Sequence, residues 1–331
     1  MFNRLICMVL MVVMAASLTV LGGCRGQISS PKPVIIGVAS SMTSALDIIA
    51  EAQGFFSQEG ITVTINEYPS GKLAMDDLLA GKIDLASSAL FPVVTNSMTR
   101  QDFRVITTVA SSANDNEIVA RRDAGIRTVQ DLKGKRVGTM QGTTTQYVLD
   151  LLLMQHHLTS RDVSISFGSP DELAARLAAK ELDAVCVLGA AVNKAQQALG
   201  ANAVVFRDEN LVRITTCVTA LDAGIKKDPD LIPRLLKAYV RAEKYIFSNP
   251  EEAFRVVTER FKIDAIVARR HWKPHMFKIV LNQSLMLDME NLARWQIQSG
   301  LVKTANVPSY LDFIYFKALE DIDADRVSII H

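Results

Sequence analysis

Apolar residues recur along this chain in two alternating patterns, one typical of strands and the other of helices. Short apolar or alternating runs predict strands, whereas longer segments with apolar residues at helical spacing predict helices. We expect strands at 34–38, 61–65, 83–86, 136–139, 163–167 and 184–188, and helices at 42–55, 73–79, 144–156 and 171–180. Strands that alternate with helices in this way predict an α/β fold whose parallel sheets are covered on both faces.

The pattern changes after Leu221. One long helical pattern begins at Asp-Pro-Asp (228–230), a second begins at Asn-Pro-Glu-Glu (249–252), and strand-like runs all but end. We therefore expect the last third of the chain to be mainly helical.

The chain also contains an internal repeat. Ile-Gly-Val at 36–38 precedes a hydroxyl-rich segment at 41–44, just as Val-Gly-Thr at 137–139 precedes Gly-Thr-Thr-Thr at 142–145. Leu-Ala-Gly-Lys-Ile-Asp (79–84) likewise matches Leu-Ala-Ala-Lys-Glu-Leu-Asp (177–183), and the glycine-to-aspartate spacings agree (84 − 37 = 47 and 183 − 138 = 45). Similar elements at similar spacing predict two lobes of like topology.

The first 23 residues predict a secretory signal peptide. Arg4 is their only charge, and an uncharged apolar run continues to residue 23. An uncleaved transmembrane helix is the alternative, because the run is long enough to span a membrane. Leu-Gly-Gly-Cys at 21–24 resembles a bacterial lipobox and favours cleavage before Cys24, which would then carry the lipid anchor. Residues 24–33 predict a solvated tether.

These features predict an exported protein. We expect it to be lipid-anchored at the outer face of the cytoplasmic membrane or within the periplasm. Arg25 follows the lipidated cysteine where an Asp commonly retains a lipoprotein at the inner membrane, so outer-membrane sorting stays open.

Charge and cysteine content narrow the function further. Removing residues 1–23 removes one Arg and no acid, so the net charge falls from +1 to 36 − 1 − 35 = 0. Without a basic excess to displace counterions, nucleic acid is not expected as a partner. Cys7 would leave with the signal peptide, and Cys186 and Cys217 lie in apolar runs. They could form a disulfide after export, but two buried free thiols are favoured.

Both repeats place hydroxyl residues at an expected helix start. The first amides of a helix lack intrahelical partners and carry the positive end of its dipole, and a glycine lets a ligand approach the backbone. Such an end accepts an anionic group without a basic side chain. The start at 142–146 is the stronger candidate and 40–43 the facing one, although ordinary N-caps would look the same. Ligands of open α/β sheets bind beyond the carboxyl ends of strands, so the two loops would enclose a cleft.

Four motifs in order resemble one family of binding proteins. They are Gly-Phe-Phe-Ser-Gln-Glu-Gly-Ile-Thr-Val (54–63), Leu-Ala-Gly-Lys-Ile-Asp (79–84), Asp-Leu-Lys-Gly-Lys (131–135) and Asn-Pro-Glu-Glu-Ala (249–253). Together they resemble the taurine, aliphatic-sulfonate, nitrate and thiamine-pyrimidine-precursor binding proteins of ABC importers. The resemblance covers about residues 33 to 270.

The resemblance implies a type II periplasmic-binding-protein fold, with two lobes joined by a two-segment hinge. Lobe 1 would comprise 34–110 and 214–331, lobe 2 would comprise 117–206, and the chain would cross at 111–116 and 207–213. It also implies a monomer that closes around a small-molecule ligand and delivers it to an ABC permease and ATPase. A ligand-sensing partner of a membrane receptor would use the same lobes.

Motif matches also select candidate ligand-binding residues, at the ends of strands and the starts of helices. They are Ser41, Met42, Thr43, Ser87, Ser88, Gly142, Thr143, Thr144, Gly189, Ala190 and Arg213. The family commonly has Trp or Glu followed by Pro near Gly189, and this departure implies a pocket of different shape. Arg213 would pair with an anion, or be a solvated hinge charge.

The first ligand hypothesis is a sulfonate, nitrate or similar anion. The alternative is a thiamine-related pyrimidine or other heterocycle, for which Phe91 and Tyr147 are candidate stacking platforms. Catalysis is not expected, because the chain lacks the clustered cysteines of the pyrimidine-precursor synthases and a nucleophile elbow. His271 and His275 have helical metal-ligand spacing, but Pro274 would disrupt the helix, so neither a metal site nor a cofactor is expected.

Overall fold

The computed structural model describes residues 32–113, 116–273 and 276–331. Residues 34–331 form one compact unit. The expected signal peptide, Cys24, most of the tether and His275 lie outside the described residues. Among the helices that are described, none combines the length and apolarity needed to cross a membrane.

Lobe 1 is built on a five-stranded sheet with the order β2-β1-β3-β10-β4. The strands are β1 (Val34–Ala39), β2 (Val63–Tyr68), β3 (Leu85–Ala89), β4 (Phe103–Ala113) and β10 (Arg213–Leu221). β1 is parallel to β2 and β3, whereas β10 is antiparallel to β3 and β4. Lobe 1 therefore takes four strands from before lobe 2 in the sequence and one, β10, from after it.

Lobe 2 has a second five-stranded sheet with the order β7-β6-β8-β5-β9. Its strands are β5 (Asn116–Arg121), β6 (Arg136–Thr139), β7 (Ser164–Phe167), β8 (Ala184–Leu188) and β9 (Ala203–Phe206). β6 is parallel to β7 and β8, and β5 is antiparallel to β8 and β9.

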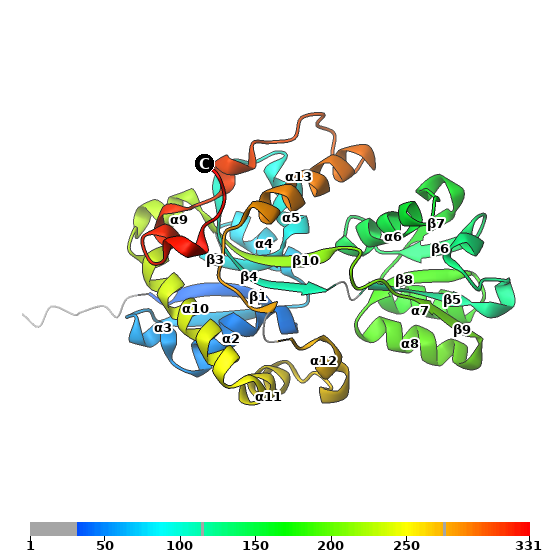
Figure 1. Ribbon diagram of the computed structural model, residues 1–331, viewed down its shortest axis with the longest axis horizontal. Helices are drawn as coiled ribbons and strands as arrows, with labels where there is room; N and C mark the ends of the chain where they lie inside the picture. Colours follow the sequence, from blue (N-terminus) through cyan, green and yellow to red (C-terminus); the bar gives the residue numbers. More distant parts are fainter. Residues whose placement is uncertain (1–31, 114–115, 274–275) are drawn as a thin grey trace, which may run out of the picture. The chain divides into compact units, whose positions relative to one another are not determined.

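The expectation of parallel sheets was wrong for the strands that carry the chain between lobes. β4 leaves lobe 1 toward lobe 2, and β10 returns from it (Figure 1). Because β10 enters lobe 1 at the end of the sheet where β1 and β3 finish, it must run against them. β5 enters lobe 2 in the same way and runs against β8. The direction of chain crossing, which no hydrophobic pattern encodes, makes both sheets mixed.

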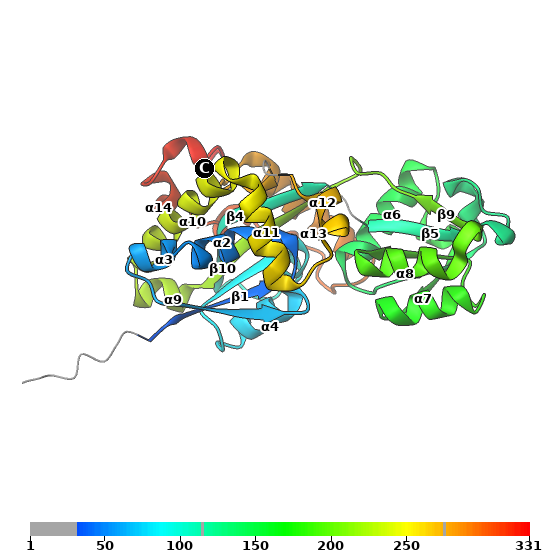
Figure 2. The ribbon, with the colours of Figure 1, turned by 90° about the horizontal axis from the view of Figure 1, so that it is seen from below.

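Helices cover both faces of each sheet (Figure 2). In lobe 1 these are η1 (Met42–Ser44), α2 (Ala45–Ala52), α3 (Phe55–Gln58), α4 (Gly71–Leu79), α5 (Leu90–Ser97), α9 (Asp222–Lys227), α10 (Leu231–Ser248), α11 (Pro250–Phe261), α12 (Ala265–His271), α13 (Gln283–Gln298) and α14 (Lys317–Glu320). In lobe 2 they are α6 (Thr144–Gln155), α7 (Pro170–Ala178) and α8 (Ala190–Leu199). The helix expected at 42–55 is in fact η1, α2 and the start of α3, interrupted at Gly54, where φ is 67°.

The internal repeat reappears as matching geometry in the two lobes. Asp84 donates its backbone N–H to the Ile35 carbonyl (2.9 Å) and accepts the Ile35 N–H on its carboxylate (2.8 Å). Asp183 makes the same two bonds with Arg136, at 2.9 and 3.0 Å. Each aspartate thus joins its parallel strand to the start of the strand that carries the repeat's glycine.

The glycines of the repeat serve close packing. A Cβ on Gly37 would lie 2.6 Å from Ile83 and 3.1 Å from Ala74 of α4, and one on Gly138 would lie 2.6 Å from Leu173 of α7. Glycine at these positions therefore lets neighbouring side chains pack closely over each strand. A ligand could not approach the backbone from that side of either glycine.

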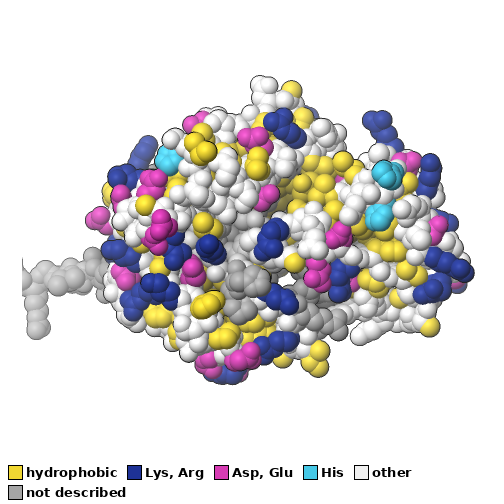
Figure 3. All heavy atoms as spheres, in the orientation of Figure 1, with side chains coloured by type: hydrophobic (Ala, Val, Ile, Leu, Met, Phe, Trp, Pro, Cys, Tyr) yellow, Lys and Arg dark blue, Asp and Glu magenta, His cyan; other side chains and the backbone are white. Residues whose placement is uncertain are grey.

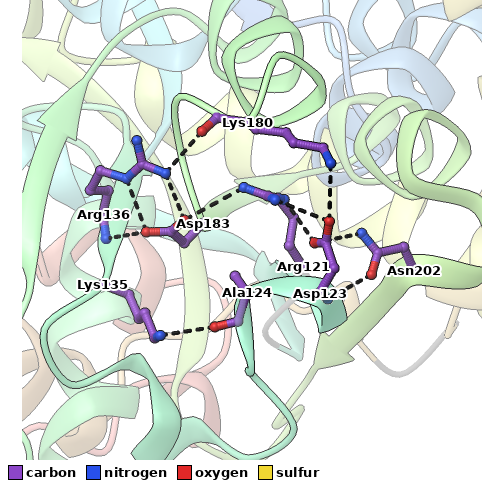
Figure 4. Close-up of polar contacts among 8 residues, drawn as sticks. All are labelled: Arg121, Asp123, Ala124, Lys135, Arg136, Lys180, Asp183 and Asn202. Atoms are coloured by element: carbon purple, nitrogen blue, oxygen red, sulfur yellow. Dashed lines mark hydrogen bonds and ion pairs between the residues drawn. The ribbon is translucent and has the colours of Figure 1, made fainter.

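Lobe 2 is braced by charged groups at the edge where β6 and β8 begin (Figure 4). Arg136 donates from its guanidinium to both carboxylate oxygens of Asp183 (2.8 and 3.0 Å), while Arg121 pairs with Asp183 and with Asp123. Lys180 and Asn202 also contact Asp123. The Arg136 guanidinium lowers the pKa of Asp183, and Arg121 lowers that of Asp123. This cluster, at the amino ends of the parallel strands, connects three strands of the sheet.

Cys186 and Cys217 are free and buried, as favoured from the sequence. They lie in β8 and β10, which belong to different sheets. Burial raises the pKa of both thiols, that of Cys217 to about 12. Neither thiol therefore has the ionised character of a reactive cysteine.

Candidate ligand-binding site

A recess lies between the lobes. Its empty volume is about 410 Å³, which includes space that is open to solvent. Its walls come from the start of α5, the start of α6, the beginning of β10 with the residue before it, and α13. The lining residues are Ala89, Leu90, Phe91, Thr144, Tyr147, Val212, Arg213, Ile214, Thr215, Asp288 and Leu292. Figure 3 shows hydrophobic side chains gathered in the hollow between α13 and α6.

Two helices, one from each lobe, begin at this recess. α5 starts at Leu90 after Ala89, and α6 starts at Thr144 after Thr143; neither has a side-chain cap on its first amides. The first N–H groups of a helix have no intrahelical acceptor, and they carry the positive end of the dipole. The two starts therefore present backbone donors to the recess from opposite lobes, an arrangement suited to an anion.

The segment before α6 is shaped by its own polar contacts. Gly142 has a φ of 64°, and its N–H donates to the side-chain oxygen of Gln146 (2.9 Å). The Thr143 hydroxyl donates to the Met140 carbonyl (2.8 Å). These bonds hold the turn and use two donors that the sequence assigned to a ligand. Thr144, which lines the recess, follows them as the first residue of α6.

Two charged side chains of opposite sign face the recess. Arg213 donates to the Ser111 hydroxyl (2.9 Å) and to the Ser111 carbonyl, so it joins the two segments that cross between lobes. Asp288 on α13 is half-buried, and burial raises the pKa of its carboxyl to about 6 although Arg213 acts to lower it. Burial also raises the pKa of Tyr147, with a smaller contribution from Asp288.

Trp295 of α13 packs against the two aromatic residues of the recess lining, Phe91 and Tyr147. Trp295 contacts Phe91 of α5 with ring centroids 5.9 Å apart and Tyr147 of α6 at 5.1 Å. Its indole N–H donates to the Asp150 carboxylate on α6 (2.9 Å). Burial raises the pKa of Asp150, whose second oxygen has no hydrogen-bond partner. One tryptophan of lobe 1 thus contacts α6 of lobe 2 through both its ring and its N–H.

The other candidate residues of lobe 1 lie away from the recess lining. The hydroxyls of Ser41 and Thr43 are 2.8 Å apart and bond each other, while Met42 belongs to the lobe 1 core. Ser87 and Ser88 are buried in β3, and the residues that follow them reach the recess instead. Their assignment as ligand contacts stays a prediction.

In lobe 2, Gly189 ends the segment after β8 and precedes α8, with a φ of 58° and no atom within 4 Å of an added Cβ. Ala190 is the first residue of α8. Gly189 does not line the recess, and the assignment of both residues as ligand contacts stays a prediction. Of the residues selected from the sequence, the recess lining includes Thr144 and Arg213 from the anion-contact candidates and Phe91 and Tyr147 from the stacking candidates.

Sequence reasoning missed the contribution of α13. Asp288 and Leu292 are four positions apart on that helix and share its face toward the recess. The helical pattern of the last third of the chain predicted a helix but could not show that it packs beside α6. The motifs that carry the family resemblance end before α13 begins at residue 283. Among the residues that the structure describes, no group of three His, Cys, Asp or Glu side chains could hold a metal ion.

Comparison with known proteins identifies the family. The family model described as "NMT1/THI5 like" matches residues 42–253 of this chain. The chain belongs to the NMT1/THI5-like family. This confirms the resemblance found in the sequence motifs, and the matched segment contains both helix starts at the recess.

Individual relatives and solved structures share at most about a quarter of their residues with this chain. The "Putative aliphatic sulfonates-binding protein" of Bacillus subtilis (strain 168) is 24% identical over 323 residues, which cover 94% of this chain and 97% of that protein. The periplasmic aliphatic sulphonate binding protein SsuA from Escherichia coli has a TM-score of 0.73 at 20% identity, covering 87% and 99% of the two chains. The periplasmic nitrate-binding protein NrtA from Synechocystis PCC 6803 has a TM-score of 0.63 at 14% identity, covering 89% and 90%. These likenesses confirm the periplasmic-binding-protein fold.

Proposed function

We propose that this protein is an extracytoplasmic solute-binding protein that captures a small anion between its lobes for an ABC importer. The observation that carries this proposal is the pair of uncapped helix starts, at Leu90 and Thr144, that border one recess from opposite lobes. An anion held by both starts would contact both lobes at once. It would therefore stabilise the arrangement in which they approach each other.

The names of the related proteins support an oxyanion as the ligand. Proteins with this fold include one named for aliphatic sulphonates and one named for nitrate. Sulfonate and nitrate both carry a negative charge spread over oxygen atoms, which accept hydrogen bonds from backbone N–H groups. The related proteins named above are binding proteins, and we propose that this chain likewise performs no catalysis.

The proposed mechanism is closure about the two crossing segments. We assign 34–110 with 214–331 to lobe 1, 117–206 to lobe 2, and 111–116 with 207–213 to the hinge. Arg213 bonds Ser111 across the hinge, and Arg207 forms an ion pair with Glu117. We further propose export by the signal peptide, lipidation at Cys24, action as a monomer, and delivery of the ligand to a permease driven by an ATPase.

One observation favours a second ligand class. Phe91 and Tyr147, the two aromatic residues suggested as stacking platforms, both line the recess. A flat pyrimidine or related heterocycle could pack against either ring. The two ligand classes are separable because only the anion depends on the backbone amides at the helix starts.

Thr144 allows one of those amides to be removed selectively. It is the first residue of α6, a position where proline is well tolerated, and Thr143 before it is extended (φ −130°, ψ 166°), as a residue preceding proline must be. Thr144→Pro deletes the N–H and the hydroxyl, whereas Thr144→Ala deletes the hydroxyl alone. Gln283→Pro, at the first residue of α13 after the extended Asn282, is the matched control.

The test is calorimetric titration of residues 27–331, which contain the whole compact unit, with ethanesulfonate, nitrate and a thiamine-related pyrimidine. We expect ethanesulfonate or nitrate to bind, and Thr144→Pro to weaken binding at least about tenfold, since a hydrogen bond to a charged group contributes roughly 1.5–3 kcal/mol. Thr144→Ala should lose less, and Gln283→Pro should lose little. Binding of the pyrimidine alone, unaffected by Thr144→Pro, would reject the anion.

Membrane attachment needs a separate experiment, because Cys24 lies outside the described residues. The full chain should partition with membranes and incorporate labelled fatty acid in a bacterial host. Cys24→Ala should abolish the label. A labelled Cys24→Ala protein would contradict lipidation at this residue.

A further inference from the structure

Asp288 is a carboxyl group of the recess that the proposed anion site does not use. Its side chain lines the recess from α13, whereas the two helix starts approach from α5 and α6. It is half-buried, and among the described residues its carboxylate makes no hydrogen bond and no ion pair. The Asp288 carboxylate has therefore lost part of its hydration without gaining a protein donor.

Within the described lining of the recess, the other ionisable side chains are Arg213 and Tyr147, and neither is paired with Asp288. Arg213 of β10 acts on Asp288 electrostatically, but its guanidinium donates to Ser111. The Tyr147 hydroxyl of α6 is neutral at pH 7, and burial raises its pKa further. Residues 90–91 of α5 carry no ionisable group. The charge of Asp288 is thus left facing the recess.

Asp150, Glu290 and Tyr310 lie on α13 or on elements beside it but outside the recess lining, and each has a partner elsewhere. Asp150 of α6 accepts the indole N–H of α13 described above. Glu290 pairs with Arg294 one turn along α13, and the hydroxyl of Tyr310 in η7 (Tyr310–Phe313) bonds a serine of α5. Asp288 is therefore the carboxyl group whose charge an anion in the recess would meet.

An ionised Asp288 conflicts with an anion in the same recess. Two like charges in one recess of about 410 Å³ repel each other, and partial burial weakens the screening by water. One bound proton removes this conflict and turns the carboxylate, which can only accept hydrogen bonds, into a carboxyl group with an O–H donor. That O–H would join the backbone amides of the helix starts as a donor to the anion.

We propose that anion binding by this protein is coupled to the uptake of one proton, which Asp288 accepts from the solvent. The anion and the proton then bind together, and each raises the affinity of the protein for the other. This inference rests on the proposed anion-binding function and adds its regulation by pH.

The direction of the pH dependence follows from the Asp288 carboxyl. Burial already raises its pKa to about 6, and a bound anion should raise that pKa further. The free protein and the complex then hold this proton equally well only below about pH 6. Anion affinity should therefore be highest there and fall as pH rises, until the pKa of Asp288 in the complex is passed.

The test is calorimetric titration of residues 27–331 with ethanesulfonate and with nitrate at pH 6.0 and pH 8.0. Both anions stay fully ionised over this range, so a change in affinity comes from the protein. Bis-Tris and Tris at equal chloride concentration are suitable buffers, because buffers that are themselves sulfonates would compete for the recess.

We expect the dissociation constant of the wild type to rise at least about tenfold from pH 6.0 to pH 8.0. Asp288→Asn cannot take up the proton, so its dissociation constant should change less than about threefold, and it should bind more tightly than the wild type at pH 8.0. Glu290→Gln, on the same helix, should keep the wild-type pH dependence. So should Asp47→Asn, because Asp47 also has a pKa of about 6 but is buried in the lobe 1 core.

A second measurement does not depend on how the variants fold. Titration of the wild type at pH 7 in bis-Tris and in Tris, whose enthalpies of ionisation differ, gives the number of protons taken up. We expect at least about half a proton for each bound anion. Binding without proton uptake, equal wild-type affinity at both pH values, or an unchanged pH dependence in Asp288→Asn would overturn the coupling and leave anion binding intact. Binding of neither anion at pH 6.0 would overturn the proposed function as well.

Discussion

Asp183 holds Arg136 by both its backbone and its side chain: the carboxylate accepts the Arg136 N–H at 3.0 Å and two guanidinium donors at 3.0 and 2.8 Å. Within the described residues, its counterpart in lobe 1, Asp84, accepts only the N–H of Ile35. The repeat has thus kept the strand connection in both lobes, while lobe 2 has added a charged brace to it. The two aspartates should differ in what they contribute to stability.

We expect Asp183→Asn to lower the free energy of unfolding by roughly 1.5–3 kcal/mol, because an amide N–H₂ would face donors that need an acceptor. Asp84→Asn, at an exposed position with one such bond, should cost about 1 kcal/mol or less. Urea denaturation of both variants measures the difference. Since Arg136 lowers the pKa of Asp183, the effect should be full at neutral pH and decline as pH falls below about 4. Equal losses in the two variants would contradict the brace.

Asp47 should make lobe 1 less stable as pH rises. It is fully buried, and desolvation raises the pKa of its carboxyl from 3.8 to about 6, although the Tyr239 hydroxyl donates to it at 2.6 Å. The nearby Ser87 hydroxyl also lowers the pKa of Asp47, although its oxygen forms no hydrogen bond within the usual distance and angle limits. The folded state therefore holds the Asp47 proton more tightly than the unfolded state. That contribution to stability is complete below about pH 4 and is lost as pH rises through about 6.

The Asp47→Asn variant tests this, because it cannot ionise. The stability of the wild type minus that of the variant should fall by roughly 2.5 kcal/mol between pH 4 and pH 7, most of the effect expected at about 1.4 kcal/mol for each unit of the pKa shift. Denaturant titrations at both pH values give the difference. A constant difference would mean that Asp47 keeps an ordinary pKa in the folded protein.

Gly138→Ala should lower stability by roughly 1–3 kcal/mol, since its Cβ would lie 2.6 Å from Leu173 and 2.7 Å from Leu182. Gly224→Ala in α9 is the control. Nothing lies within 4 Å of a Cβ there, so helix propensity should leave it neutral or stabilised by up to about 1 kcal/mol. Thermal unfolding monitored by circular dichroism compares the two. A stabilised Gly138→Ala would show that α7 can move away from the sheet without cost.

Trp295→Phe should weaken the contact between the lobes. Phenylalanine keeps an aromatic ring beside Tyr147 but leaves the Asp150 carboxylate without its donor. Losing a bond to a charged acceptor, roughly 1.5–3 kcal/mol, would shift the balance of lobe arrangements about ten- to hundredfold. Small-angle scattering should record a larger radius of gyration. Trp272→Phe is the control, because the buried Trp272 N–H has no partner and its ring packs on Phe254 and Phe277 in lobe 1. If both variants match the wild type, the Trp295 bond does not hold the lobes.

The parts of the fold that depend on local sequence were predicted, whereas the parts that depend on long-range chain path were not. β6 and β8 occur at the predicted residues, 136–139 and 184–188, because each is a short run of strand-forming residues between clear breaks. The antiparallel strands β4, β5 and β10 were not expected as such, since their direction follows from the long-range path of the chain. The helix expected at 42–55 kept its apolar spacing but is broken at Gly54, where the left-handed backbone ends α2.

The candidate site divides in the same way. The start of α6 at Thr144 was predictable, because a glycine and a run of threonines before an apolar pattern predict a helix N-terminus. Thr143 itself had an unforeseen use, since its hydroxyl bonds the nearby Met140 carbonyl. Asp288 could not be selected from sequence, because a carboxylate on an amphipathic helix most often faces solvent. Only the packing of α13 beside α6 brings it to the recess.

The pairing of β4 with β10 also indicates where the two lobes could be separated. Ala113 and Arg213 are opposite each other in the register of these antiparallel strands. The whole of lobe 2 is therefore an insertion at the tip of a β-hairpin, entered and left through neighbouring points of one sheet. Joining Ala113 to Arg213 by a tight turn would close that hairpin without moving a strand of lobe 1. Lobe 1 would then be an autonomous module, and lobe 2 a removable insertion.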